Sequence, residues 1–482
     1  MAPKPVHQPT SVVIVGGGLA GLAAAAALAG RGLPITLLES RPRLGGRASS
    51  FVDPATGENI DNCQHVSLGC CTNLDHFCRR VGAESLLRRE RAVVFLGPDG
   101  RLSRLEAGPL PAPFHLSASF LRLRFLSFTE KLKIARGLAA LALKRDERPG
   151  EPFSLWLLRH GQTVRTVSLF WAAVLVSALN ERLEQMDVGH ARKVFLDGFL
   201  RNRRGYEMVI PLVPLGELYG TRLEEWLARK GVQVRLTTGA KSIECDDEGS
   251  IAGVRLRSGE TLRADFVVLA VPFERACGLL ADDLRARLPG VERIDGIQAS
   301  PITGIHFWFD RPVCPLPHVA TLGKLVQWVF NHTALQGREA AEGGQYLQLV
   351  VSASYDLLPL EKTAIRDVAL AELAELWPAA REAKLLRWWV VTEHTATFST
   401  RPGIDSLRPR QRTAVEGFFL AGDYTATGWP ATMEGAVRSG YLAAECVLED
   451  LGRPERIVRP SLRPGWLSRI LLGRPGPDRP AV

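Results

Sequence analysis

The chain has 482 residues, of which 46% are hydrophobic and 23% are charged. This balance is typical of a globular protein with about two or three domains, and it does not predict a disordered chain. The 60 Lys and Arg residues exceed the 51 Asp and Glu residues, and the net charge of +9 favours an anionic partner: a membrane surface, a nucleic acid or an anionic cofactor.

The N-terminal residues show no pattern of a secretory signal. Residues 1–10 lack the apolar stretch and the cleavage site of such a signal. No CxxC pair occurs among the eight cysteines, so the spacing does not predict a zinc site. We therefore expect reduced thiols, a cytoplasmic location and no bound metal.

The first elements of the chain predict a strand–helix–strand unit. Residues 11–15 are β-branched and indicate a buried parallel strand, residues 20–30 are rich in Ala and indicate a helix, and residues 33–39 indicate a second strand. A unit of this length is typical of a doubly wound dinucleotide-binding fold. Residues 11–30 are also uncharged and long enough to span a membrane, but the glycines among them favour a phosphate-binding turn.

A GxGxxG motif joins the first strand to the helix. Gly16 permits a tight turn, Gly18 lets the backbone approach a pyrophosphate, and Gly21 lets the helix pack on the strand. The helix N-terminus then offers free N–H groups to the phosphates. Glu39 lies 21 residues beyond Gly18, close to the spacing of about 20 expected for an acid that binds a ribose hydroxyl. The predicted cofactor-binding residues of this unit are Gly16, Gly18, Leu19, Ala20, Gly21 and Glu39.

A second glycine patch follows Glu39 directly. Two glycines flanked by arginines can present backbone N–H groups and a guanidinium to phosphate oxygens. The alternative is a charged turn without a ligand. The candidates in this patch are Ser40, Arg41, Gly45, Gly46 and Arg47.

The later elements alternate between helical and strand patterns. Residues 106–205 are mostly helical, and residues 231–271 indicate several strands with turns between them. Further strands are expected at 267–271, 301–311, 345–355 and 418–421, and further helices at 363–376 and 434–451. The strand at 418–421 ends in Gly422 and Asp423, which places a carboxylate where it can accept hydrogen bonds from the hydroxyls of a cofactor.

The chain thus begins and ends with pieces of one dinucleotide fold. We expect the cofactor domain to be assembled from residues 1–105, 206–285 and 411–452. The other parts are a helical insertion at 106–205 facing substrate or membrane, a substrate-domain sheet at 286–410 and a basic tail at 453–482.

Together these motifs resemble the flavin amine oxidase and phytoene desaturase superfamily. The resemblance rests on the ExxxxxGGR segment at 39–47, the VVLAVP strand end at 267–272 and the LAGD segment at 420–423 followed by a helix. It implies an α/β fold: a discontinuous Rossmann-like FAD/NAD(P)-binding domain of the GR2 type, with an inserted α+β substrate domain and a helical cap. It also implies FAD as the cofactor, with Thr432, Met433 and Ala436 at the start of the last helix among the residues that bind it.

Three segments narrow the resemblance to the bacterial hydroxysqualene dehydroxylases of hopanoid synthesis, which convert hydroxysqualene to squalene. They are DNCQH at 61–65 followed by Gly69, the segment 304–312, and the segment 428–441, which is similar almost letter for letter. The resemblance implies a C30 isoprenoid substrate, adds Gln64 to the cofactor-binding residues and suggests association with upstream enzymes of the squalene pathway. Cys63 departs from the family's Gly in DNGQH, Cys71 stands where an aromatic residue is common, and residues 393–397 replace a more basic stretch.

The resemblance also bears on attachment of the flavin. Some amine oxidases bind flavin covalently through a Cys in the region that corresponds to 428–440, where this chain has none. We therefore expect non-covalent FAD.

Asp61 and His65 are the candidate catalytic residues. Removal of an allylic hydroxyl requires protonation of the departing oxygen, and His titrates near neutral pH. The alternative for His65 is a structural hydrogen bond to the flavin or the backbone, and the alternative for Asp61 is a structural role in fixing a loop.

A C30 hydrocarbon requires a long apolar pocket, for which two regions supply aromatic side chains. For each residue taken singly, an ordinary place in the core is the better interpretation. The candidates are Phe153, Trp156, Phe170, Trp171, Phe307, Trp308, Phe309, Trp328 and Phe330.

Two basic stretches, residues 109–145 and the tail from Gly452, also carry large apolar side chains. This mixture favours a peripheral site on the inner face of the cell membrane over nucleic acid, for which no recognition motif occurs. A solvated surface and a flexible tail are the alternative. The rival functions are a carotenoid-type desaturase or amine oxidase of the same superfamily, and a non-catalytic flavoprotein that serves as a membrane scaffold.

Overall fold

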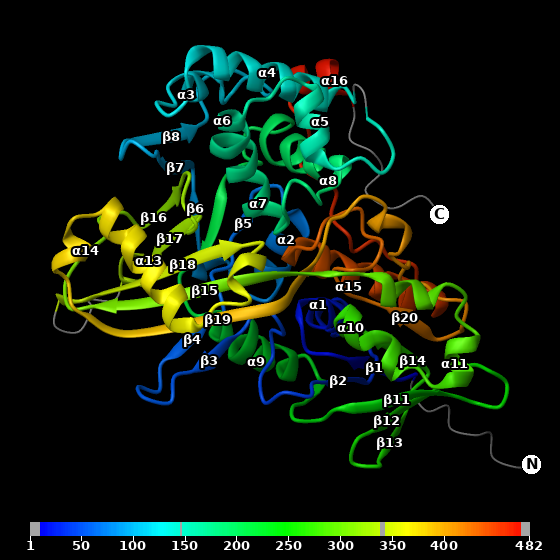
Figure 1. Cartoon of the computed structure of the whole chain (residues 1–482). Coiled ribbons are helices and arrows are strands. Elements are labelled where there is room, and N and C mark those ends of the chain that lie inside the picture. The colour runs from blue at the N-terminus through cyan, green and yellow to red at the C-terminus, as the bar shows by residue number, and fades with distance from the viewer. Residues whose placement is uncertain (1–9, 145–146, 338–342, 474–482) are drawn as a thin grey trace, which may run out of the picture.

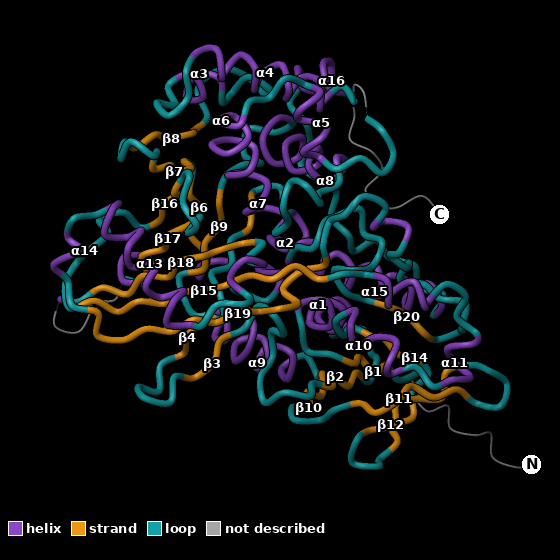
Figure 2. Tube along the Cα trace, in the orientation of Figure 1, coloured by secondary structure: helices purple, strands orange, loops and turns teal. Residues whose placement is uncertain are grey.

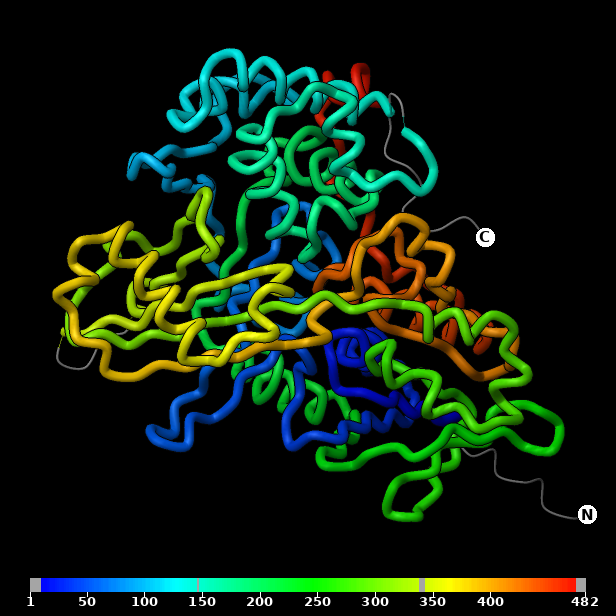
Figure 3. Tube along the Cα trace, viewed as in Figure 1, coloured from blue at the N-terminus to red at the C-terminus, as the bar shows by residue number. Residues whose placement is uncertain are grey.

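The computed structural model describes residues 10–144, 147–337 and 343–473. Two β-sheets lie next to each other, and a group of helices covers one end of the molecule (Figure 1). Figure 3 shows that the N-terminal segment, in blue, lies beside the orange-red segment that contains α15 (Met433–Asp450), although almost the whole chain separates them.

The first sheet has five parallel strands in the order β10-β2-β1-β14-β20. Its strands come from distant parts of the chain: β1 (Val12–Val15), β2 (Ile35–Leu38), β10 (Val232–Arg235), β14 (Phe266–Leu269) and β20 (Phe418–Leu420). β1 and β14 are buried along their whole length, which explains why their sequences are continuous apolar runs.

Two helices far apart in the sequence pack together against this sheet. α1 (Leu19–Leu28) is buried along its whole length, and α15 (Met433–Asp450) crosses it. At the crossing a Cβ on Gly440 would lie 2.1 Å from the Ala20 carbonyl oxygen. Only glycine therefore allows α15 to approach α1 this closely, and the contact joins the two ends of the chain in one layer.

The second sheet has seven strands in the order β19-β15-β18-β17-β16-β7-β8. Figure 2 shows it beside the first sheet. Its strands are β7 (Ala92–Leu96), β8 (Leu102–Glu106), β15 (Ala299–Phe309), β16 (His318–Thr321), β17 (Trp328–Asn331), β18 (Gln345–Ser352) and β19 (Leu385–Phe398).

One predicted boundary needs correction. We expected residues 1–105 to belong to the cofactor domain, but β7 and β8 pair into the second sheet. Ala320 and Thr321 of β16 lie in parallel register with Phe95 and Leu96 of β7. This pairing joins segments more than 200 residues apart, and no local pattern predicts it.

The helical end of the molecule, here called the cap, is formed by the insertion expected at 106–205. Its helices are α3 (Ser117–Leu121), α4 (Phe128–Ala142), α5 (Phe153–Arg159), α6 (Val164–Thr166), α7 (Ala173–Leu179) and α8 (Val188–Lys193), with π-helical turns at Val167–Ala172 and Val194–Leu200. α4 begins at a capping box, in which Ser127 and Glu130 satisfy each other's backbone N–H groups.

The C-terminal segment returns to the cap. Gly465 N donates to Arg201 O, Ser468 Oγ donates to Leu200 O, and α16 (Trp466–Leu472) lies beside the cap helices at the top of Figure 1. The described part of the expected basic tail therefore packs first against Glu445 and Asn73, to which Ile457 N and Arg459 N donate, and then on the cap. Arg145 and residues 474–482 lie outside the described residues.

Smaller elements complete the fold. A two-stranded sheet is formed by β3 (Ser50–Val52) and β4 (Asn59–Asp61). Two three-stranded sheets are formed by β5 (Ser67–Leu68), β9 (Met208–Pro211) and β6 (Leu87–Glu90), and by β11 (Ala240–Cys245), β12 (Ile251–Leu256) and β13 (Thr261–Arg263). The other helices are α2 (Thr72–Arg80), α9 (Arg222–Arg229), α10 (Phe273–Ala276), α11 (Asp282–Ala286), α12 (His332–Gln336), α13 (Lys362–Leu376) and α14 (Ala379–Glu382). A further π-helical turn at Gly216–Thr221 precedes α9. Within the described residues, no helix has both the length and the apolar character needed to cross a membrane.

Candidate active site

One cavity of about 1290 Å³ runs from the first sheet to the cap. At one end it is lined by the glycine turns after β1 and β2, and at the other by α7, the second π-helical turn of the cap and the second sheet. We call these two parts the cofactor end and the chamber. The volume exceeds that of an ordinary ligand pocket, about 300–1,000 Å³, and leaves room for two molecules.

The cofactor end is built largely from backbone. Gly16 turns the chain after β1 with a φ of +114°, and a Cβ on Gly21 would lie 1.9 Å from the Gly16 carbonyl oxygen. Gly18 differs, because a Cβ there would have no neighbour closer than Gly46 Cα at 3.9 Å. The absence of a side chain at Gly18 therefore keeps a space open rather than allowing protein atoms to pack there.

That open space lies at the N-terminus of α1. Gly18 is the N-cap residue and provides no side-chain cap, so the first N–H groups of the helix are left for a ligand. Gly45 and Gly46, both with positive φ, lie opposite Gly18. A helix N-terminus facing a glycine turn fits an anionic diphosphate.

Glu39 has a fixed orientation at the end of β2. Its carboxylate accepts hydrogen bonds from Gly17 N and Arg41 N, both at 2.8 Å. It is buried but lines the cavity beside Ser40 and Arg41. These contacts fix the carboxylate where the ribose of a dinucleotide would lie.

Arg47 and Asp423 join the two predicted halves of the site. Arg47 Nη2 lies 2.6 Å from Asp423 Oδ1, and Arg47 Nη1 donates to Ala396 O. Burial disfavours the charged form of Arg47, but the Asp423 carboxylate outweighs it and raises the pKa of the guanidinium. The pair is therefore ionised and holds the second glycine turn against the end of β20.

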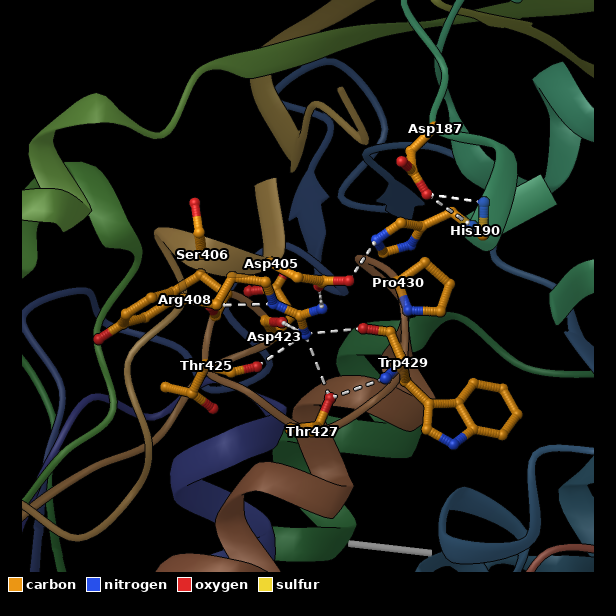
Figure 4. A network of polar contacts seen from close by, with 12 residues as sticks. Asp187, His190, Asp405, Ser406, Arg408, Asp423, Thr425, Thr427, Trp429 and Pro430 are labelled. Atoms are coloured by element: carbon orange, nitrogen blue, oxygen red, sulfur yellow. Dashed lines mark hydrogen bonds and ion pairs between the residues drawn. The ribbon is translucent and has the colours of Figure 1, made fainter. Parts of the chain in front are cut away.

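Arg408 is a buried residue that the sequence analysis missed. Its guanidinium donates to the carbonyl oxygens of Asp423, Thr425 and Trp429 and pairs with Asp405 (Figure 4). Asp405 in turn lies 3.4 Å from His190 of the cap. Arg408 thus fixes the loop between β20 and α15, which carries Asp423, and links it to the cap. No motif marks this residue, because its acceptors are backbone atoms.

Asp61, a predicted catalytic residue, does not line the cavity. Asp61 Oδ1 accepts hydrogen bonds from Ser50 Oγ at 2.5 Å and from Leu215 N at 2.8 Å. Burial raises the pKa of Asp61 to about 7. This carboxyl joins β4 to the segment before α9, and its position argues against direct contact with a substrate.

His65, the other predicted catalytic residue, does line the cavity. His65 Nδ1 lies 2.9 Å from Cys63 O and must donate to it, since a carbonyl oxygen only accepts. Burial lowers the pKa of His65, and the charge of Arg47 lowers it further, so the ring is neutral near pH 7. His65 Nε2 is then an acceptor, which suits positioning of a ligand better than donation of a proton.

The predicted cofactor-binding residues converge on the cofactor end, with one exception. Gly21 does not line the cavity, because its role is the close contact of α1 with the turn. The buried Gln64 Oε1 has no hydrogen-bond partner within the described residues, as expected of an atom that accepts a hydrogen bond from a ligand. The cavity lining includes Gly16, Gly18, Leu19, Ala20, Glu39, Ser40, Arg41, Gly45, Gly46, Arg47, Gln64, Gly422, Asp423, Thr432, Met433 and Ala436.

The chamber is mostly apolar and is made by both the cap and the second sheet. Of the nine aromatic residues expected to form it, Trp328 and Phe330 line the cavity, and the others pack into the cores of the cap and the second sheet or, for Trp308, stack on Tyr346. The apolar lining residues are Val66, Leu68, Val93, Phe95, Ala173, Val174, Ala178, Val194, Phe199, Met208, Ile302, Trp328, Phe330 and Val350.

The chamber also contains charge. Lys193 and Asp197, both in its lining, are joined by a hydrogen bond of 2.7 Å between Lys193 Nζ and Asp197 Oδ2. Lys193 Nζ also lies 4.4 Å from the centroid of the Trp429 ring, in the loop that Arg408 holds. These residues stand where the cofactor end meets the chamber.

The family model for flavin containing amine oxidoreductases matches residues 19–448. The chain belongs to this family. FAD is its cofactor, and the fold combines a Rossmann-like FAD-binding domain with a substrate domain, as the sequence predicts.

Known relatives extend over nearly the whole chain. A 15-cis-phytoene desaturase from Solanum lycopersicum is 29% identical over 93% of this chain and 79% of the relative. A hydroxysqualene dehydroxylase from Sinorhizobium fredii is 32% identical over 92% of this chain and 99% of the relative. The structure of an oxidoreductase from Methanosarcina mazei superposes with a TM-score of 0.69 at 18% identity, over 91% of this chain and all of that one. The family match and the two sequence relatives show that the chain is an FAD-dependent oxidoreductase related to enzymes that act on isoprenoids, and the structural neighbour supports the fold.

The residues present fit FAD. The open space between Gly18 and Gly46 can accept the diphosphate, Glu39 can bind the ribose, and the unpaired Gln64 Oε1 supplies an acceptor. The Arg47–Asp423 pair lies where the two glycine-bearing segments meet. No group of three or more metal-ligating side chains occurs within 10–144, 147–337 and 343–473.

Proposed function

We propose that the protein is a hydroxysqualene dehydroxylase, which removes the allylic hydroxyl of a C30 isoprenoid alcohol reductively and yields squalene for hopanoid synthesis. The observation that carries the proposal is the continuity of the FAD site with a large, mostly apolar chamber that contains the Lys193–Asp197 ion pair. An apolar wall fits the hydrocarbon chain, and the charged cluster fits a substrate that carries one polar group.

The chain's own residues provide what this reaction requires of a protein. Bound FAD supplies the hydride chemistry. Val174, Phe199 and Phe330 contribute to an apolar wall that excludes water, which protects the developing positive charge on the allylic carbon. The neutral His65 ring can accept a hydrogen bond through Nε2 and so orient a ligand. We propose non-covalent attachment of FAD through the residues of the cofactor end.

A phytoene-type desaturase is the second candidate. The relatives from plants favour it, since they are 28–29% identical over similar lengths. The higher identity and the nearly complete coverage of the Sinorhizobium fredii relative favour the dehydroxylase. A desaturation substrate is a pure hydrocarbon and gives no role to a charged cluster in the chamber.

We further propose that the protein docks on the inner face of the cell membrane through its cap. Arg122, Arg124 and Lys133 are exposed there, and the apolar side chains of Phe128 and Ile470 are 73% and 70% exposed. Basic residues mixed with exposed apolar ones favour an anionic lipid surface. Such docking would let a water-insoluble substrate enter from the bilayer, near the upstream enzymes of the squalene pathway.

Co-expression with the upstream squalene-pathway enzymes, in a host that makes no squalene, tests the proposed function. Lipid extraction should show squalene in cells that carry this protein, and hydroxysqualene in cells that carry the upstream enzymes alone. Hydroxysqualene without squalene in the complete strain would contradict the dehydroxylase assignment and leave the FAD-binding assignment intact.

A further inference from the structure

Lys193 is a charged side chain in the lining of a mostly apolar chamber, where it pairs with Asp197. It ends α8, directly before the π-helical turn Val194–Leu200, and its side chain is 25% exposed. π-helical turns occur frequently at functional sites, because the extra residue in the turn redirects side chains. Here the turn contributes Val194, Asp197, Gly198 and Phe199 to the cavity lining.

The cluster around Lys193 has more positive than negative charge. Asp197 accepts from Lys193 Nζ through one oxygen and from Arg201 Nη1, at 2.6 Å, through the other. Burial alone would raise the pKa of Asp197, but the two cations outweigh it and lower that pKa, so the carboxylate is ionised. Two cations therefore share one anion, and Arg201 alone could neutralise it.

The Lys193 ammonium is left with unused donors. It has three N–H groups, of which Asp197 accepts one, and the rest of the described chain offers it no further hydrogen-bond acceptor. Its position over the Trp429 ring orients it toward the loop that leads into the cofactor end. A donor that is partly removed from water and lacks an acceptor costs free energy unless a ligand supplies an oxygen.

We propose that Lys193 is the specificity-determining residue of the chamber and donates a hydrogen bond to the hydroxyl oxygen of the isoprenoid alcohol. The hydrogen bond would place the carbon that bears the hydroxyl at the junction of chamber and cofactor end. A hydrocarbon offers Lys193 no acceptor. This proposal rests on the proposed function.

A purely structural ion pair is the competing explanation, and ligand binding distinguishes the two. If the pair is purely structural, replacement of Lys193 should change the affinity of every ligand of the cavity equally, or of none. If Lys193 binds the hydroxyl, its replacement should lower the affinity for the alcohol and leave the affinity for the hydrocarbon unchanged. Arg201 still pairs with Asp197 when Lys193 is replaced, so no carboxylate is left without a cation and Lys193 can be replaced without unfolding the protein.

The experiment compares binding of hydroxysqualene and squalene to the FAD-loaded protein in detergent micelles. Change in the visible absorbance of FAD gives the affinity, and FAD content and melting temperature check the fold. Lys193→Met should weaken binding of hydroxysqualene by about 10- to 100-fold and leave squalene binding unchanged. Lys193→Arg should retain most of the discrimination, and Lys362→Met, at an exposed position of α13 outside the cap and the cavity, should change neither affinity.

Two results would overturn the proposal: unchanged hydroxysqualene binding in Lys193→Met, or equal loss for both ligands. If Lys193→Met does not retain FAD, Lys193→Gln is tested in the same way. Squalene production by the wild type is scored separately. If Lys193→Met loses the preference for hydroxysqualene over squalene but the wild type produces no squalene, only the proposed function is contradicted. If the wild type produces squalene but Lys193→Met binds hydroxysqualene as the wild type does, only this inference is contradicted.

Discussion

The cofactor end and the chamber differ in what builds them. The cofactor end consists of backbone turns and one helix N-terminus, fixed by glycines whose missing side chains can be read directly from the sequence. The chamber consists of side chains from the cap, from β7 and from β15, β17 and β18. A site built from backbone therefore requires a recognisable motif in the sequence, whereas a cavity built from side chains depends on how distant segments of the chain pair.

The largest expected effect tests the two roles assigned to glycine at the cofactor end. Gly21→Ala places a Cβ 1.9 Å from the Gly16 carbonyl oxygen, and we expect no recovery of folded, FAD-bound protein. Gly18→Ala is the matched variant, because its Cβ meets nothing closer than 3.9 Å and its φ of −76° suits alanine.

Gly18→Ala should therefore leave the stability of the FAD-free protein within about 0.5 kcal/mol of the wild type and weaken FAD binding by roughly 10-fold or more. Urea unfolding of the FAD-free protein and fluorimetric titration with FAD measure the two quantities. Equal loss of stability in both variants would mean that Gly18 is needed for folding and not for the phosphate.

The next effect concerns the loop that joins the two regions. Arg408→Met leaves the carbonyl oxygens of Asp423, Thr425 and Trp429 without their buried donor. We expect a loss of about 3–5 kcal/mol in unfolding free energy and faster release of FAD. Chemical denaturation and flavin fluorescence measure these changes.

Arg412→Met is the control for Arg408. The Arg412 side chain is 43% exposed and pairs with Glu449 and Asp450 on the surface, so its loss should cost no more than about 1 kcal/mol. Equal costs in the two variants would show that Arg408 does not organise the loop.

The same contrast sets how much of the molecule the sequence could predict. The first sheet, α1, α15 and most of the glycine-turn residues that line the cofactor end follow from the strand–glycine–helix pattern and from Glu39, which are local signals, whereas Gln64, Thr432, Met433 and Ala436 followed from the family resemblance. Arg408 was missed because it binds backbone carbonyls, and Lys193 because an i,i+4 pair with Asp197 resembles any solvated helix face. β7 was misplaced because its pairing with β16 spans more than 200 residues.

The aromatic residues show the same limit within the chamber. Trp156 and Trp171 are fully buried in the core of the cap, whereas Trp328 faces the cavity. Residue type alone does not separate these positions, because both environments favour large apolar side chains. Only the packing of the π-helical turn at 167–172 and of the second sheet decides which side chains face the ligand.

A smaller effect tests the revised role of Asp61. Its pKa of about 7 in the folded protein exceeds the value of about 3.9 in an unfolded chain, so the folded state binds the Asp61 proton more tightly. The carboxyl therefore destabilises the fold progressively as the pH rises from about 4 to 7. Asp61→Asn should become more stable than the wild type over this window, by about 1–3 kcal/mol at pH 8, and should retain activity.

Thermal unfolding of Asp61→Asn between pH 4 and 8 measures this difference. Asp247→Asn, in an exposed turn, should show no such dependence on pH. Loss of activity in a folded, FAD-loaded Asp61→Asn protein would restore Asp61 as a catalytic candidate.

The smallest effect concerns the outer face of the cap. Replacing Arg122 and Arg124 by Gln should weaken binding to anionic liposomes by about 1 kcal/mol per charge, and salt should reduce the difference. Arg229→Gln and Arg263→Gln, on the other domain, are the controls. Deletion of 452–482 is less informative, because Ile457 is buried and Arg459 N donates to Asn73. Unchanged sedimentation of the Arg122 and Arg124 variant would contradict docking through the cap.

The most direct test of one cavity shared by FAD and an isoprenoid alcohol is an anaerobic single turnover. The FAD-loaded protein is reduced photochemically and mixed with hydroxysqualene in micelles, and absorbance and extracted lipids are recorded. We expect recovery of the oxidised FAD absorbance, with one squalene formed per FAD. No recovery with hydroxysqualene, together with bleaching of the oxidised protein by a hydrocarbon polyene, would contradict it and identify a desaturase.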